Sequence, residues 1–202
     1  LSSPWHEGDG GFWVRALLLD GSIRDEMRPA VDASKSHLQE IGLQVETVRL
    51  KEKRIGQCRG CYDCWVRTPG QCIIDDDAKE VMRSFVNSQV IVLLTPVTFG
   101  GHSSQLKKIL DRLLGCTLPY LERCGGETRH PRRYDMVQRM LFVGLLPHRD
   151  HEAQATYREL SERNALNFRA SGWAMALVFS NERPEMASIA VREALLKAGI
   201  AP

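Results

Sequence analysis

Residues 90–112 read VIVLLTPVTFGGHSSQLKKILDR, and this stretch decides the fold. The unbroken apolar run at its start, residues 90–94, is typical of a strand buried on both faces of a parallel sheet. The strand ends at Thr95-Pro96, and the two glycines of the following loop let a planar ligand approach the backbone closely. The serines at 103 and 104 then open a helix, whose free amides can face an electron-rich ring edge. This helix has a buried stripe, made of Leu106, Ile109, Leu110 and Leu113.

The same alternation of strands and helices extends in both directions. Apolar runs predict further strands at residues 14–19, 45–50, 140–146 and 173–179. Helical patterns follow the strands, at about residues 29–42, 75–87, 151–168 and 184–198. Such an order implies a parallel, doubly wound sheet with helices on both faces. Ligands of these sheets bind beyond the carboxyl ends of the strands, so we expect the site in the loops after Leu19, Leu50, Leu94 and Leu146.

Composition is that of an ordinary globular protein and excludes several classes of function. Of the 202 residues, 43% are hydrophobic and 26% are charged, and the formal net charge is +2. This charge is too small to make nucleic acid or an anionic membrane surface the main partner, and no apolar run approaches the roughly 20 residues of a membrane helix. We expect a polar tail at residues 1–12, without the layout of a signal peptide, and a single cytoplasmic domain at residues 13–202. Hydrolytic motifs and P-loops are absent.

Four cysteines fall within an insertion at residues 51–76 and follow the pattern C-x2-C-x2-C-x7-C, as Cys58, Cys61, Cys64 and Cys72. Thiolates at this spacing can reach the irons of one 4Fe-4S cubane. Four thiolates also bind zinc, although three so closely spaced suit a cubane better. Alternatively, the segment is a folded flap that packs its cysteines as small hydrophobic side chains, or it has thiol redox activity.

In the segment that ends the central strand and begins the next helix, the chain resembles the NAD(P)H-dependent FMN reductase family of flavodoxin-like proteins. The resemblance is carried by TPVTFGGHSSQLKKILDR and extends from about residue 14 to about residue 179. It implies a flavodoxin-like sheet of five parallel strands in the order 2-1-3-4-5. It also implies FMN as cofactor, NAD(P)H as co-substrate, an electron acceptor that the sequence does not name, and a homodimer. The residues beside the flavin ring would be Pro96, Val97, Thr98, Phe99, Gly100 and Gly101.

The cysteine spacing is similar to that of the iron-sulfur flavoproteins, a branch of the same fold that carries a 4Fe-4S cluster beside FMN. This similarity makes an electron carrier with Cys58, Cys61, Cys64 and Cys72 as ligands the alternative to an FMN reductase. A second alternative is a non-catalytic binding module that keeps the fold and has lost FMN. Because the cofactor carries the redox chemistry, no protein acid or base is predicted.

The loop after the first strand departs from the family pattern. It begins with Gly21-Ser22-Ile23-Arg24, so the resemblance places the FMN phosphate near Ser22 and Arg24. The family's Gly-Asn-Thr-like run is missing, and Asp25 and Glu26 stand there instead. A phosphate needs amides, hydroxyls and positive charge. The two carboxylates therefore oppose FMN unless they turn outward.

A long irregular loop is expected at residues 116–136, and long loops in compact domains are usually functional. Its Arg129, Arg132 and Arg133 suit phosphate recognition, because a guanidinium binds phosphate bidentately. The loop could close over the flavin, bind a nicotinamide dinucleotide phosphate, contact a second subunit, or be a solvated basic loop. His102 stands where it could border the flavin or be a surface residue.

Overall fold

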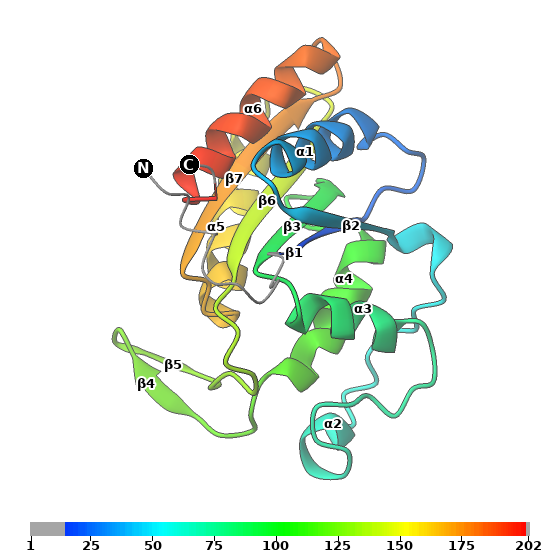
Figure 1. Ribbon diagram of the computed structural model, residues 1–202, viewed down its shortest axis with the longest axis vertical. Helices are drawn as coiled ribbons and strands as arrows, with labels where there is room; N and C mark the ends of the chain where they lie inside the picture. Colours follow the sequence, from blue (N-terminus) through cyan, green and yellow to red (C-terminus); the bar gives the residue numbers. More distant parts are fainter. Residues whose placement is uncertain (1–14, 201–202) are drawn as a thin grey trace.

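The computed structural model describes residues 15–200, and its centre is a parallel sheet of five strands (Figure 1). Their order is β2-β1-β3-β6-β7. This matches the predicted 2-1-3-4-5 when the strands of a separate hairpin, β4 and β5, are left out of the numbering. Their bounds are β1 Arg15–Asp20, β2 Gln44–Arg49, β3 Val90–Pro96, β6 Arg139–Leu146 and β7 Gly172–Phe179.

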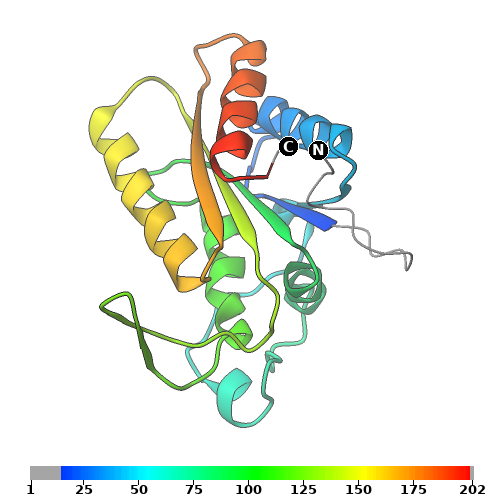
Figure 2. The same cartoon turned by 60° about the vertical axis from the view of Figure 1, so that its left-hand side comes forward.

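Helices cover both faces of this sheet, as expected from the alternating pattern (Figure 2). One face carries α1 (Arg28–Glu40) and α6 (Pro184–Lys197), and the other carries α3 (Ala78–Val86), α4 (Ser104–Arg112) and α5 (His151–Asn167). Successive residues of β3 pack into opposite layers, because side chains alternate along a strand. Residues 90–94 are therefore all buried, which explains their unbroken apolar run.

The prediction of an irregular loop at residues 116–136 was wrong in part. The segment contains a short antiparallel hairpin of β4 (Glu122–Cys124) and β5 (Glu127–Arg129). Gly125 and Gly126 form its turn with φ of 60° and 85°, as a two-residue hairpin turn requires. Three further short helices, α2 (Asp63–Val66) and the 3-10 turns Leu50–Glu52 and Leu113–Cys116, were also not predicted.

Two other expectations concern the ends of the chain and the membrane. The predicted tail at residues 1–12 lies outside the described residues. Within residues 15–200, every helix is too short or too polar to cross a lipid bilayer.

Candidate functional site

The loops after β1 and β3 meet at the carboxyl edge of the sheet. Ser103 connects them, because its hydroxyl donates to the Gly21 carbonyl oxygen at 2.7 Å and accepts from the Leu106 amide at 3.3 Å. The second contact caps α4. The Ser103 amide also donates to Thr95 Oγ1 at 2.8 Å. The two segments that the sequence singled out are thus held together by buried hydrogen bonds.

Gly21 is required where these loops cross. A Cβ atom at this position would lie 2.7 Å from Ser103 Oγ and 2.9 Å from Leu106 Cβ. The next residue, Ser22, is buried, and its hydroxyl oxygen has no hydrogen-bond partner in the protein. Its amide donates to Asp20 Oδ1 at 2.9 Å. A buried polar atom without a partner is costly, so Ser22 is suited to contact a polar ligand.

The two carboxylates that follow turn in different directions. Asp25 turns away from the loop and pairs with Lys51, with an N···O distance of 2.7 Å. Glu26 turns onto the loop and accepts hydrogen bonds from the backbone amides of Ile23 (3.3 Å) and Arg24 (2.6 Å). Burial alone would raise the pKa of Glu26, but hydrogen bonds from its own amide and from the amides of Arg24 and Ile23 hold it below its usual range. The side chain of the predicted phosphate contact Arg24 is exposed.

The predicted ring-binding loop, residues 96–101, ends in a tight turn. Thr98 and Gly101 exchange two backbone hydrogen bonds of 3.0 and 2.9 Å. Between them, Phe99 and Gly100 have φ of 50° and 75°, as in a type I′ turn. The Phe99 side chain is fully exposed, at 104% of its reference area. Gly100 lies against α5, where a Cβ would be 2.6 Å from Thr156 Cγ2.

A cavity of about 700 Å³ opens beside this loop and is large enough for a cofactor-sized ligand. Gly101 and His102 border it on one side and the cysteine segment, residues 51–76, contributes Cys58 and Tyr62 on another. Asn164 of α5 closes part of the wall. Tyr62 and Asn164 were not predicted. No sequence pattern marks Asn164. Tyr62 has a left-handed backbone, with φ of 58°, in a turn that the sequence does not specify.

His102 is a neutral histidine at the edge of this cavity. Burial lowers its pKa to about 4, and the positive charge of Lys107 adds to the effect. Asn164 Nδ2 lies 3.2 Å from His102 Nε2, which assigns the acceptor role to Nε2 and the proton to Nδ1. His102 Nδ1 is buried and has no partner in the protein. An N–H donor without a partner is therefore buried beside the cavity.

The four cysteines of the cysteine segment lie near one another as free thiols. Burial raises the pKa of Cys64, and its neighbours Cys72, Cys58 and Cys61 raise it further. Four thiols match the donor chemistry of an iron-sulfur cluster. In the described part of the chain, however, no three metal-binding side chains converge on one point. The structure thus gathers the predicted ligands on one segment without forming a metal site.

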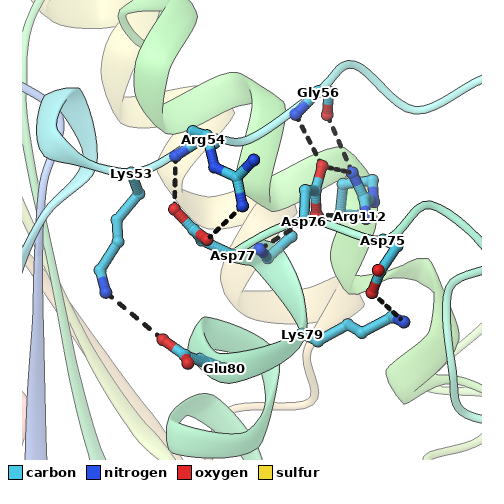
Figure 3. A network of polar contacts seen from close by, with 10 residues as sticks. Lys53, Arg54, Gly56, Asp75, Asp76, Asp77, Lys79, Glu80 and Arg112 are labelled. Carbon is cyan, nitrogen blue, oxygen red and sulfur yellow. Dashed lines mark hydrogen bonds and ion pairs between the residues drawn. The ribbon is translucent and has the colours of Figure 1, made fainter.

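Arg112, the last residue of α4, clamps the base of the cysteine segment (Figure 3). Its guanidinium makes two contacts of 2.9 Å with the Asp76 carboxylate and donates to the carbonyl oxygens of Gly56 (3.0 Å) and Ile74 (3.4 Å). Burial alone would lower the pKa of Arg112, but Asp76 and the neighbouring Cys72 raise it. The two ends of the segment are thereby fixed to α4, which forms a wall of the cavity.

The aspartates before α3 do more than start that helix. Asp76 accepts from the first-turn amide of Ala78 at 3.1 Å, in addition to binding Arg112. Asp77 accepts from the Arg54 amide at 2.7 Å, and Asp75 binds Lys79 Nζ at 2.8 Å (Figure 3). The three aspartates therefore join the start of α3 to the cysteine segment and to the buried Arg112.

The hairpin arginines are engaged with the protein. Arg129 donates to Glu127 at 3.2 Å, and Arg133 Nε donates to the Gly115 carbonyl oxygen at 2.9 Å. Arg132 donates to the Arg169 carbonyl oxygen. The Arg129 contact stays within β5, whereas the contacts of Arg132 and Arg133 fasten the segment after the hairpin to the domain. The three guanidinium groups are therefore not arranged as a free phosphate clamp.

Part of the chain is similar in sequence to curated proteins. An iron-sulfur flavoprotein of Methanocaldococcus jannaschii is 33% identical over 105 residues, which cover 49% of this chain and 51% of the relative. An iron-sulfur flavoprotein of Archaeoglobus fulgidus is 33% identical over 84 residues, which cover 42% of this chain and 37% of the relative. The chain thus spans about half, or less, of the length of these relatives.

Solved structures share the fold over nearly the whole chain. An NAD(P)H:quinone oxidoreductase from Methanothermobacter marburgensis matches with a TM-score of 0.66 and 15% identity, covering 90% of this chain and 97% of its own. An FMN-dependent NADH-azoreductase from Bacillus anthracis matches with a TM-score of 0.62 and 12% identity, covering 92% and 98%. In the sequence itself, residues 14–123 match the family described as NADPH-dependent FMN reductase. Because this match spans more than half of the chain, the protein belongs to that family.

Proposed function

We propose that the protein is a flavin-dependent oxidoreductase that passes reducing equivalents from a nicotinamide cofactor through bound FMN to an acceptor. The observation that carries this proposal is the glycine turn at the end of β3. Its Gly101 lines a cofactor-sized cavity, and Ser103, two residues further on, binds the loop after β1. Family membership supports a flavin, and the solved quinone oxidoreductase and azoreductase of the same fold support redox chemistry.

In this proposal, Pro96, Val97, Thr98, Phe99, Gly100 and Gly101 lie beside the flavin ring. His102 Nδ1 offers a neutral donor to a ring acceptor, since its low pKa keeps the imidazole uncharged near neutral pH. The Ser22 hydroxyl contacts the polar end of the flavin. A bound flavin supplies the hydride and electron transfer, while the protein supplies position and electrostatics. A homodimer is part of the proposal, since a second subunit can complete the wall of the open cavity.

The Gly101→Leu variant tests the site. The structure leaves room for a Cβ at Gly101, where the nearest atom is Thr98 O at 3.5 Å. The added side chain should therefore leave the fold intact and block the approach of a planar ring. We expect NADPH oxidation with FMN and a quinone acceptor to fall at least about tenfold, while the melting temperature changes little. A variant that oxidises NADPH as fast as the wild type would contradict the placement of the flavin.

A second candidate is an iron-sulfur flavoprotein electron carrier. It is favoured by the clustering of Cys58, Cys61, Cys64 and Cys72 and by the iron-sulfur flavoproteins among the relatives. The thiols would have to move together to hold a cluster, so no step of the proposed mechanism depends on one.

Iron and acid-labile sulfide assays after anaerobic purification test this candidate. If it holds, the wild type contains about four irons per chain, as a cubane requires, and Cys64→Ser lowers the iron content sharply. Cys124→Ser is the matched control, because Cys124 lies in the hairpin, outside the cysteine segment. Iron-free wild-type protein, or equal iron in both variants, would rule the cluster out.

A further inference from the structure

The loop after β1 already contains an anion in the place where a phosphate would bind. Backbone amides of consecutive residues in such loops form concave anion sites. Here the amides of Ile23 and Arg24 both point at the carboxylate of Glu26, at 3.3 and 2.6 Å. The bonds run to different oxygens, Oε1 and Oε2, so the carboxylate bridges the two amides. An incoming phosphate would need the same donors.

The surrounding contacts hold Glu26 in this position. The following residue, Met27, is buried with 1% of its surface exposed and leads directly into α1. The preceding residue, Asp25, has a left-handed backbone with φ of 60°, and its side chain is paired with Lys51. The Arg28 amide donates to the Asp25 carbonyl oxygen at 3.0 Å. The turn is therefore fixed on both sides of Glu26.

A buried hydroxyl in this loop nevertheless remains without a partner. The Ser22 hydroxyl is buried and has no partner, although its residue lies next to the occupied amides. A hydroxyl can donate to or accept from an uncharged alcohol as well as a phosphate. The loop thus offers a neutral polar contact while its anion-binding amides are taken.

We propose that Glu26 is a specificity-determining residue that occupies the phosphate subsite and selects against flavins that carry a phosphate. The chain then binds riboflavin-class flavins, which end in an uncharged ribityl alcohol, at least as tightly as FMN. FMN binds only when Glu26 leaves its two amides, because two anions cannot share them. This inference rests on the proposed flavin function and revises its cofactor: a flavin without a phosphate binds directly, and FMN binds only with Glu26 displaced.

Flavin fluorescence titrations with FMN and with riboflavin test the proposal on the wild type, Glu26→Ala and Glu26→Gln. Glu26→Ala vacates the amides, whereas Glu26→Gln keeps the shape and removes the charge. We expect FMN to bind Glu26→Ala at least about tenfold more tightly than the wild type, as the release of charge-assisted hydrogen bonds implies. Riboflavin affinity should change less than about twofold. Glu26→Gln should shift FMN affinity in the same direction by a smaller factor.

Asp25→Asn is the matched control. It removes the same charge from the neighbouring residue, and asparagine tolerates the left-handed backbone. Since Asp25 does not contact the loop amides, its replacement should change the preference between FMN and riboflavin less than about threefold. Asp25→Asn could change this preference as much as Glu26→Ala does. The preference would then depend on the negative charge of the loop and not on the position of Glu26, which would overturn the proposal.

Inorganic phosphate separates failure of this proposal from failure of the flavin function. Phosphate should raise the melting temperature of Glu26→Ala more than that of the wild type, whether or not a flavin binds. If neither flavin binds any variant, the flavin function fails, and the phosphate arm still decides whether Glu26 blocks an anion site. Equal phosphate effects on wild type and Glu26→Ala, or unchanged FMN affinity in a flavin-binding variant, would overturn the proposal.

Discussion

Replacing Arg112 with methionine is expected to lower the free energy of unfolding by about 3–5 kcal/mol. The Arg112 side chain is fully buried, and its bidentate partner Asp76 is 10% exposed. The variant leaves the Asp76 carboxylate without its countercharge and frees two backbone carbonyls at Gly56 and Ile74. Urea denaturation measures the loss. The same change should release the cysteine segment, so Cys64 and Cys72 should react faster with a thiol reagent.

Arg54→Met is the control for this prediction. Arg54 pairs with Asp77 at 3.7 Å, but its side chain is 86% exposed, and exposed ion pairs contribute at most about 1 kcal/mol. Arg112→Met could lower the free energy of unfolding by no more than Arg54→Met does. In that case, the buried network of Figure 3 would not be what anchors the cysteine segment.

Gly100→Ala is expected to lower the free energy of unfolding by about 2–5 kcal/mol. A left-handed backbone costs a residue with a Cβ about 1–2 kcal/mol, and overpacking against a neighbour costs about 1–3 kcal/mol. Both apply here, because Gly100 has φ of 75° and its Cβ would be 2.7 Å from Thr156 Cβ. The strain should also displace the turn and weaken flavin binding, which thermal melts and flavin titration measure together.

The neighbouring Gly101→Ala provides the comparison for stability. Its Cβ meets no atom closer than 3.5 Å, so we expect a change within about 1 kcal/mol. Equal destabilisation by the two substitutions would show that the close approach of the turn to α5 does not cause the loss in free energy of unfolding.

The sheet could be predicted from the sequence because burial on both faces leaves unbroken apolar runs, as in residues 90–94. The hairpin was missed because its strands have three residues each, too short for a readable alternation, although Gly125-Gly126 is a hairpin turn signal. Short polar strands depend on contacts with the domain, such as that of Arg163 with Glu127 at 2.8 Å.

The site could be predicted only where local sequence defines the backbone. The turn around Gly100 and the helix cap at Ser103 are local features, and both are where the sequence suggested. The orientation of Asp25 is not local, because it depends on Lys51, which follows β2. Glu26 instead binds backbone amides two and three residues before it, in a turn whose shape the sequence does not specify. From the sequence, we expect both carboxylates to oppose a phosphate unless their side chains turn outward. In the structure Asp25 does so and Glu26 does not.

A flavin titration followed by visible absorption, on protein purified without oxygen, tests the central claim most directly. The wild type should bind flavin, as FMN or riboflavin, in a one-to-one complex with a perturbed flavin spectrum, and Gly101→Leu should lose this binding while remaining folded. A folded wild type that leaves the spectra of both flavins unchanged would contradict the account and favour a binding module that has lost its flavin.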